Sequence, residues 1–330
     1  MAVRTELIAA DAAGIARAAA LLRAGLLVAF PTETVYGLGA NALDASAVAR
    51  IYAAKSRPSD NPLIVHVARP GDIGRWAVAD ERAWRLAERF WPGPLTLVLP
   101  SRGALGDGTI ALRMPDEPVA LSLLAACARP VSAPSANRSG RPSPTTAEAV
   151  LEELGGRIEA VLHGPPAKVG IESTVLDLTG PRPLILRPGG VDQRQIEDAL
   201  ALEVGSEAGS GRSPGTRYRH YAPDVPVRLF SGSDAWLREE LAQALLDEPR
   251  SLYIGLAASA PAGARGLLAQ DLEELQQRLY AFLREAELTG VPVLAALPPP
   301  SPAAAGVRDR LWRAAGGIVT KGSGGSGEAP

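Results

Sequence analysis

Apolar positions along the chain follow two periods, and the two alternate through most of its length. An apolar stripe with helical spacing at 11–24 follows Asp11, a favourable N-cap, and stops before Gly25, so it predicts a helix. The uninterrupted apolar run 26–30 stops at Pro31 and predicts a buried strand. The alternation that begins here predicts a fold that mixes helices and strands.

The same reasoning extends the pattern to about residue 202. Strands are expected at 63–67, 95–99, 108–114, near Val131, 161–162, 174–178 and 184–187, and helices at 44–54, 80–90, 117–127, 145–154 and 192–201. Strands and helices do not alternate strictly, which indicates an α/β fold with a twisted mixed sheet.

The last third of the chain has a more regular pattern. Strands at 225–230, 251–256 and 291–297 each precede a helix, at 234–246, 271–287 and 306–315. Strict alternation predicts a small, Rossmann-like parallel sheet with right-handed crossovers. No G-x-G-x-x-G follows its first strand, so dinucleotide binding is not supported.

Between these regions the periodicity disappears. Residues 203–224 are rich in Gly and Ser and end in the aromatic, basic stretch S-P-G-T-R-Y-R-H-Y-A-P, which is unusual for a mere spacer. We therefore expect a first α/β domain at 1–202, an interdomain linker at 203–224, a C-terminal α/β domain at 225–318 and a disordered tail at 319–330.

Composition narrows the class of protein. The 330 residues include 34 Lys and Arg against 36 Asp and Glu, so bulk charge does not favour nucleic acid, and no stable nucleic-acid binding is expected. The single cysteine, Cys127, excludes a disulfide framework and a multi-cysteine metal site, and fits a reducing compartment. Charged residues interrupt the N-terminal segment, and no apolar run is long enough to span a bilayer. We expect a cytoplasmic protein with no membrane association.

Polar residues gather where the predicted strands end, which is where α/β sheets bind ligands. P-T-E-T-V-Y-G-L-G-A-N at 31–41 places hydroxyls and a carboxylate after the first buried strand, although a plain glycine turn explains it equally well. At 55–67, Lys55, Arg57, Asn61 and His66 flank another strand and suit a phosphate-bearing ligand, while cations at a helix end also suit its dipole.

Four further polar segments follow later in the chain. Arg113 lies inside an apolar strand, and a buried arginine needs an anion, either an internal carboxylate or a ligand. The loop 131–145 carries small hydroxylic residues that can cradle phosphate, or can equally be a surface loop. Ser173 opens a strand and Arg187 closes one. Their repeated placement at strand ends favours one shared pocket.

The motifs together resemble a known family. P-T-E-T-V-Y-G-L-G, K-x-R-P-x-x-N-P-L-I-V-H, W-P-G-P-L-T, S-A-P-S-A-N-x-S-G, E-S-T-V and I-L-R-P-G occur in the order typical of the YrdC-like family. The linker and C-terminal unit resemble those of its longer, two-domain members, which synthesise threonylcarbamoyl-AMP. The resemblance covers about residues 5–320, and it implies that 1–202 is the catalytic domain and that the linker at 203–224 acts as a lid.

The resemblance implies a reaction and its participants. L-threonine, bicarbonate or CO2 and ATP would give L-threonylcarbamoyladenylate and pyrophosphate, and a tRNA threonylcarbamoyl-transfer complex would act downstream. It implies threonine binding by Thr34, His66, Arg113, Ala133 and Ser173. It implies ATP binding by Arg57, Asn61, Thr109, Ser135, Ser143, Arg187 and Tyr221. No protein nucleophile is expected; Lys55 and Arg57 would stabilise charge, and Mg2+ would be held by the ATP phosphates rather than by protein ligands.

Two other functions stay open at this stage. Relatives of the catalytic domain bind RNA, but residues 1–222 hold 24 basic and 23 acidic side chains, which weakens an RNA-binding module. A carbamoyltransferase domain of the kind found in hydrogenase maturation would be accompanied by acylphosphatase and zinc-finger modules. One cysteine and no zinc motif weaken that alternative.

Overall fold

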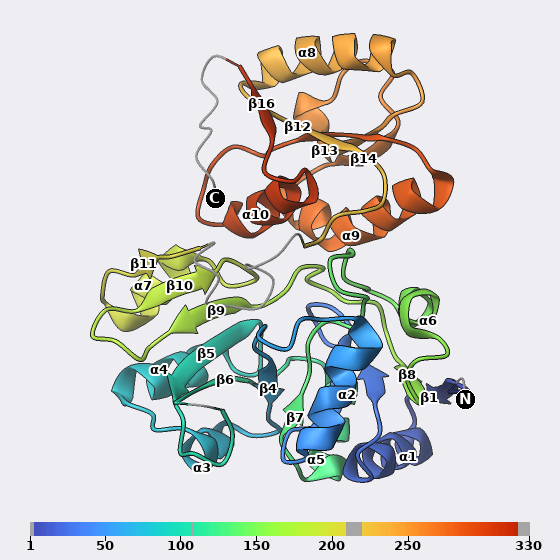
Figure 1. Ribbon diagram of the computed structural model, residues 1–330. Helices are drawn as coiled ribbons and strands as arrows, with labels where there is room; N and C mark the ends of the chain where they lie inside the picture. The colour runs from blue at the N-terminus through green and yellow to red at the C-terminus, as the bar shows by residue number, and fades with distance from the viewer. Residues whose placement is uncertain (1–2, 107, 209–219, 323–330) are drawn as a thin grey trace. The chain divides into compact units, whose positions relative to one another are not determined.

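The computed structural model describes residues 3–106, 108–208 and 220–322, and these form two compact units (Figure 1). Of the described residues, the first unit holds 3–139, 143–168 and 172–208, and the second holds 140–142, 169–171 and 220–322. Two short segments from the first two-thirds of the chain thus group with the C-terminal unit. A single boundary along the sequence therefore does not separate the two units.

The first unit is built on an 11-stranded mixed sheet. Its strands are β1 (Glu6–Ala9), β2 (Val28–Phe30), β3 (Gly37–Asn41), β4 (Ile64–His66), β5 (Leu95–Pro100), β6 (Thr109–Arg113), β7 (Val131–Ser132), β8 (Ala160–His163), β9 (Thr174–Asp177), β10 (Leu184–Arg187) and β11 (Gly205–Ser206). They lie in the order β1-β8-β2-β3-β7-β4-β6-β5-β9-β10-β11. Parallel pairs such as β4 with β6 adjoin antiparallel pairs such as β5 with β6, which confirms the expected mixed α/β class.

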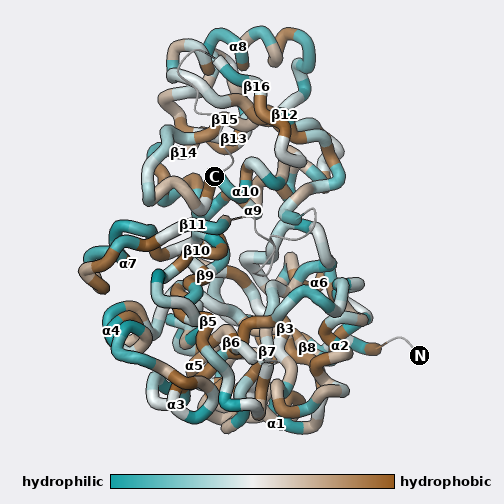
Figure 2. The backbone as a smooth tube through the Cα atoms, turned by 60° about the vertical axis from the view of Figure 1, so that its left-hand side comes forward, coloured by the Kyte–Doolittle hydropathy of each residue, from teal (hydrophilic) through white to brown (hydrophobic). Residues whose placement is uncertain are grey.

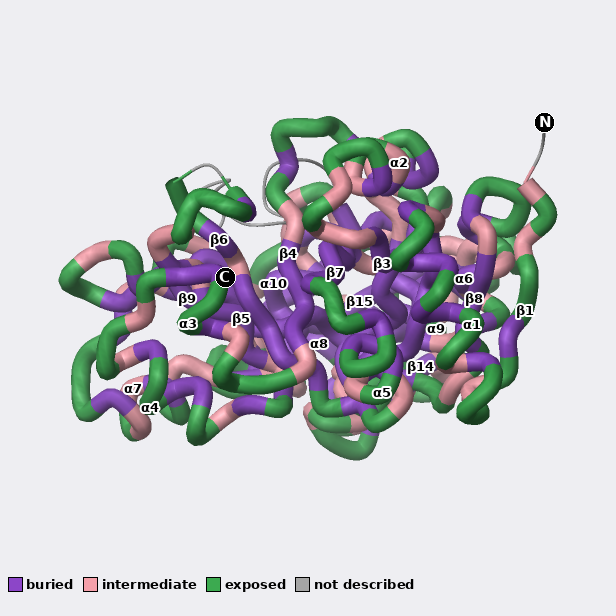
Figure 3. The backbone as a smooth tube through the Cα atoms, turned by 90° about the horizontal axis from the view of Figure 1, so that it is seen from below, coloured by how far each residue is buried: buried purple, intermediate pink, exposed green. Residues whose placement is uncertain are grey.

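Helices cover both faces of this sheet. They are α1 (Ala12–Arg23), α2 (Ala45–Lys55), α3 (Ile73–Trp76), α4 (Glu81–Phe90), α5 (Pro118–Cys127), α6 (Ala147–Leu154) and α7 (Gln193–Leu200), with a short 3-10 turn at Pro70–Asp72. Alternate residues of β2 point to opposite layers: Val28 and Phe30 pack in the cluster that contains α1 and α5, and Ala29 packs in the cluster that contains α2 and α6. Buried residues follow the central strands (Figure 3), and much of their sequence is hydrophobic (Figure 2).

The second unit has a five-stranded sheet in which every pair is parallel. Its elements are β12 (Val227–Ser231), α8 (Asp234–Asp247), β13 (Leu252–Leu256), a 3-10 turn (Ala257–Ser259), β14 (Gly266–Ala269), α9 (Leu272–Thr289), β15 (Val293–Ala296), α10 (Ala305–Ala314) and β16 (Val319–Lys321). The strand order is β14-β13-β15-β12-β16, which confirms the expected parallel C-terminal sheet.

Local sequence explains where the helices begin and end. The Asp11 side chain accepts a hydrogen bond from the Gly14 amide, and the Asp44 side chain accepts from the amides of Ser46 and Ala47. After α1, Gly25 adopts φ +77, a left-handed conformation that disfavours other residues. A Cβ there would also lie 2.8 Å from an Asp44 carboxylate oxygen, so the turn and the cap of the next helix require each other.

The structure departs from the sequence expectations at five strands. The segment Gly37–Asn41, interpreted as a loop, is strand β3, whose glycines let Phe30 and Val131 pack against its backbone. β1 was not expected, and β14 interrupts the strict strand–helix alternation. Strand β11 lies within the segment expected to be a linker, where Gly205 and Ser206 pair with β10. At the expected tail, Val319–Lys321 pairs with β12. Backbone pairing with an available strand edge stabilises these short segments although they lack apolar periodicity.

The described helices include none whose length and hydropathy would let it cross a bilayer.

Candidate functional site

A loop between β2 and β3 supplies the first group of site residues. The Thr32 hydroxyl donates to the Val35 carbonyl (2.6 Å) and accepts from the Val35 amide (3.3 Å), which closes a tight turn. Thr32, Glu33 and Thr34 are all buried. The turn therefore holds two hydroxyls and a carboxylate away from water at the end of β2.

Arg113 at the end of β6 joins this loop. Its Nη2 donates to Thr34 Oγ1 (2.8 Å) and lies 2.7 Å from Glu33 Oε1. The Arg113 and Glu33 side chains are 5 % and 4 % exposed. The internal carboxylate that a buried arginine needs is thus Glu33, which was not among the expected site residues. The T-E-T sequence signalled its presence but not its partner, 80 positions away.

His66 at the end of β4 lies beside Arg113, because the two residues are register partners in parallel strands. Its ring meets Phe30 edge-on, with centroids 6.1 Å apart. Burial, with a smaller contribution from the Arg113 charge, lowers the pKa of His66 to about 3. The imidazole is neutral at physiological pH, and its Nδ1 has no hydrogen-bond partner in the described part of the chain. Thr34, His66 and Arg113, three of the expected threonine ligands, are thus brought together.

A second group forms around Ser173, just before β9. Arg187 Nη2 donates to Ser173 Oγ (3.1 Å) and to its carbonyl (2.8 Å), and Thr96 Oγ1 lies 2.8 Å from Ser173 Oγ. An expected threonine ligand is therefore in direct contact with an expected ATP ligand. Thr96, on β5, belongs to the W-P-G-P-L-T motif but had no role assigned from the sequence.

Sheet topology places these two groups on one edge. Strands β4, β6, β5, β9 and β10 are consecutive neighbours, and they carry in turn His66, Arg113, Thr96, Ser173 and Arg187. β4, β6 and β10 run in one direction and β5 and β9 run in the opposite direction. The C-terminal ends of the first three strands and the N-terminal ends of the other two therefore lie at the same edge, at or near which each residue is found. The sheet order thus assembles residues from distant parts of the chain into one row.

A third group surrounds the end of α2. The buried Lys55 ammonium donates to the carbonyls of Ser135 and Asn137, and so holds the loop after β7 against the helix. Burial, and then the neighbouring Arg57 charge, lower the pKa of Lys55 well below its ordinary value. Arg57 Nη2 donates to the Pro62 carbonyl (3.0 Å). Through its two bonds Lys55 holds a loop in place, a structural role that was not expected; the charge stabilisation expected of it stays a prediction.

The remaining expected residues of the first unit are dispersed. Both polar side-chain atoms of Asn61 are buried without a hydrogen bond to described residues. Ser143 Oγ donates to Glu172 Oε1 (2.6 Å), and the Ala133 amide donates to the Ile64 carbonyl (2.9 Å). Thr109 is exposed and lines a mainly apolar pocket of about 370 Å³ together with Tyr52, Leu63, Val65, Ser132 and Val175. Its size and apolar walls suit a flat ring.

Tyr221 belongs to the second unit. It is buried there at φ +63, with the Arg310 guanidinium 5.1 Å from its ring centroid and the Tyr280 and His220 rings at 5.6 and 4.4 Å. These contacts of Tyr221 are with linker and second-unit residues. Of the linker aromatics, Tyr218 lies outside the described residues.

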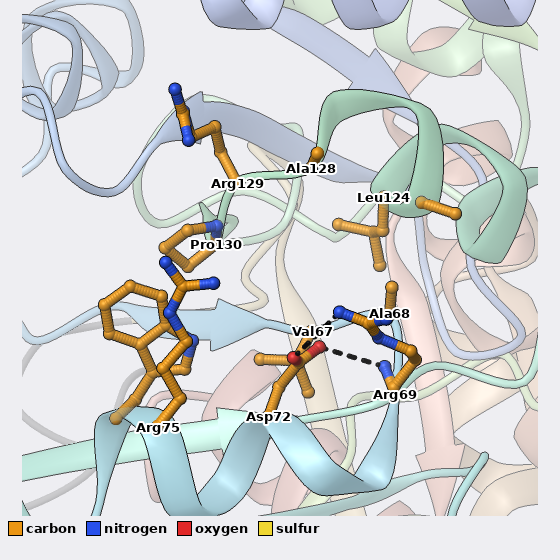
Figure 4. A pocket seen from close by; sticks show the side chains of 11 residues that line it. Val67, Ala68, Arg69, Asp72, Arg75, Leu124, Ala128, Arg129 and Pro130 are labelled. Atoms are coloured by element: carbon orange, nitrogen blue, oxygen red, sulfur yellow. Dashed lines mark hydrogen bonds and ion pairs between the residues drawn. The ribbon is translucent and has the colours of Figure 1, made fainter.

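Another pocket is lined by none of the expected residues. It measures about 330 Å³ and is bordered by Val67, Arg69, Asp72, Arg75 and Arg129 (Figure 4). Asp72 pairs with Arg69 at 3.6 Å, and the three arginines lie at exposed positions. No group of three or more His, Cys, Asp or Glu side chains that could hold a metal is present among the residues that the structure describes.

Two family models match consecutive parts of the chain. Residues 20–189 match the model of the Sua5, YciO and YrdC family, described as telomere recombination, and residues 191–316 match a model described as the C-terminal domain of threonylcarbamoyl-AMP synthase. The chain is 43 % identical to a threonylcarbamoyl-AMP synthase of Pyrococcus abyssi, over 84 % of this chain and 87 % of that protein. It is 42 % identical to that of Bacillus subtilis, over 93 % of this chain and 94 % of that protein. The crystal structure of P. abyssi Sua5 complexed with L-threonine superposes with a TM-score of 0.89 at 39 % identity, and covers 96 % of this chain and 100 % of that one.

Proposed function

The chain belongs to the Sua5, YciO and YrdC family and carries the C-terminal domain of threonylcarbamoyl-AMP synthases. We propose which of its residues bind each substrate in the synthesis of threonylcarbamoyl-AMP. The chain is an enzyme that makes L-threonylcarbamoyladenylate from L-threonine, bicarbonate or CO2 and ATP and releases pyrophosphate. This is the first step of threonylcarbamoyladenosine modification of tRNA. We propose that a tRNA threonylcarbamoyl-transfer complex consumes the product.

The threonine end of the site is the Arg113 group. Arg113 is buried, is already hydrogen-bonded to Thr34, and lies beside neutral His66. A guanidinium binds a carboxylate with two donors in a fixed fork, so we assign the threonine carboxylate to Arg113. Ser173 and the backbone near Ala133 complete the proposed threonine set.

The nucleotide end uses separate loops. Arg187 and Arg57 are buried cations on different elements, and each would neutralise phosphate charge. We propose that the adenine ring occupies the pocket lined by Thr109. The side-chain amide of Asn61, which has no hydrogen bond to described residues, supports a polar ligand beside that pocket. Ser135 and Ser143 supply further hydroxyls, and we propose that Tyr221 reaches the nucleotide when the linker at 203–224 closes. Magnesium would arrive bound to the ATP phosphates, which a site without a carboxylate cage among its described residues can accept.

This arrangement needs no covalent enzyme intermediate. The threonine ammonium group first releases a proton to water. The amine nitrogen then forms a bond to the carbon of CO2 and releases a second proton to water, which gives a carbamate. A carbamate oxygen then bonds to the α-phosphorus as the bond to pyrophosphate breaks. The enzyme would contribute position and charge stabilisation, because the row of residues from His66 to Arg187 could hold the amino acid and the phosphates of the nucleotide at one sheet edge. A closing linker would keep the labile carbamate from water.

The contact between Ser173 and Arg187 carries this proposal, because it joins the two expected binding sets in one place. The test is pyrophosphate release by the full chain with each substrate omitted in turn. Release should require L-threonine, bicarbonate and ATP together. Pyrophosphate formed at the same rate without threonine would contradict the assignment. For the compartment we propose the cytoplasm, where the one buried thiol of Cys127 would stay reduced.

A further inference from the structure

The ion pair between Glu33 and Arg113 leaves hydrogen-bonding capacity unused on both partners. Arg113 Nη2 directs its hydrogen bond to Thr34 Oγ1, while Glu33 Oε1 lies at ion-pair distance without a hydrogen bond. Neither Glu33 oxygen has a hydrogen-bond donor among the described residues, and Arg113 Nε has no acceptor there. A buried carboxylate without donors is costly, since it loses its bonds to water and gains none in return.

Simple charge neutralisation does not explain this geometry. An arginine and a glutamate that merely balance each other gain most from two parallel N–H···O bonds, which this pair does not make. Instead the pair offers free acceptors on Glu33 and a free donor on Arg113, side by side and away from water. An α-amino acid zwitterion carries the complementary groups, three N–H donors next to a carboxylate.

We infer that Glu33 binds the α-ammonium group of the amino-acid substrate while Arg113 binds its carboxylate. This inference rests on the proposed function and adds to it a residue outside the expected threonine set. Glu33 would fix the position of the nitrogen that later bonds to CO2. It would also make the site selective for amino acids over hydroxy acids of the same shape, because a hydroxyl carries no charge to pair with the carboxylate.

The test compares two ligands in two variants by calorimetry on the full chain. The ligands are L-threonine and 2,3-dihydroxybutanoate of the same configuration, in which a hydroxyl replaces the ammonium group. The wild type should prefer threonine by about 10- to 100-fold, the usual worth of a buried charge-assisted hydrogen bond. In Glu33→Gln the preference should fall to within about threefold, while ATP affinity stays the same.

A matched control separates this effect from the general loss of a buried glutamate. Glu153 is also buried and also pairs with an arginine, Arg138 at 3.3 Å, in a group apart from the Arg113 residues. Glu153→Gln should keep the full preference for threonine. A preference that is unchanged in Glu33→Gln would overturn the inference.

A second measurement avoids variants and covers the case in which Glu33→Gln does not fold. A crystal structure of the wild type with L-threonine should place the ligand nitrogen within about 3.2 Å of a Glu33 oxygen. A nitrogen that faces away from Glu33 would refute the inference. If the wild type binds no threonine at all, the proposed function fails instead, so the two failures are distinguishable.

Discussion

Removing Arg113 should cost stability as well as substrate binding, because it strands a buried carboxylate. In Arg113→Met, Glu33 loses the cation 2.7 Å away and stays buried with 4 % of its side chain exposed. Breaking a buried ion pair by removing one partner typically costs about 3–5 kcal/mol. Thr34 Oγ1 also loses a donor, but it keeps its contact with Thr32 Oγ1 at 2.9 Å.

The double variant Arg113→Met/Glu33→Gln distinguishes pairing from packing. With both charges gone, the free energy of unfolding should recover to within about 1–2 kcal/mol of the wild type, since replacing a whole buried pair is often nearly neutral. Threonine binding should stay lost in both variants, because no guanidinium is present. Arg113→Lys should also bind threonine poorly, since an ammonium cannot supply the fork.

Urea denaturation of the full chain, with threonine calorimetry in parallel, makes the measurement. The coupling energy between Arg113 and Glu33 is the change in unfolding free energy of the double variant minus the sum of the changes in Arg113→Met and Glu33→Gln. Arg85→Ala, an exposed arginine on α4 that pairs with Glu81, serves as the control and should change stability by less than about 1 kcal/mol. Equal destabilisation of the single and double variants would refute the reasoning, because Glu33 would then carry no penalty when left alone.

Further predictions concern the nucleotide end of the site, the buried His66 and the linker. Arg57→Ala should raise the KM for ATP by about 10- to 100-fold, with a much smaller change in threonine affinity. Equal losses for both substrates, with a lowered melting temperature, would indicate a folding defect instead. His66 is buried in its neutral form with a pKa lowered to about 3, below its ordinary value of about 6.5, so its contribution to stability is full above pH 6.5 and falls as pH drops from 6.5 towards 3. Unfolding free energies measured across this window should decline less steeply in His66→Gln than in the wild type, and parallel curves would contradict the burial argument. For the linker, ATP with threonine should slow tryptic cleavage at Arg217 and Arg219, which lie outside the described residues; unchanged cleavage rates would exclude closure but not the enzyme assignment.

Local sequence determined most elements of this protein. Apolar runs such as 26–30 predicted buried strands, and Asp11 and Asp44 predicted helix starts that the structure confirms through cap hydrogen bonds. These features depend on residues a few positions apart, so spacing and side-chain type suffice to recognise them. The family motifs likewise predicted Thr34, Arg113 and Ser173 as site residues, and their roles stay predictions.

Tertiary structure decided which residues of the different motifs contact one another. The segment Gly37–Asn41 carries no strand periodicity and becomes β3 because the edge of β2 is available for pairing. The sequence required an anion for Arg113 but could not choose between a ligand and an internal carboxylate. Glu33 was selected by the packing of the β2–β3 loop against β6, across 80 positions of chain. The contact of Ser173 with Arg187 and the row that continues to His66 depend on the order β4-β6-β5-β9-β10. Strand order follows from long-range packing and crossover connections, which leave no mark at the spacing of neighbouring residues.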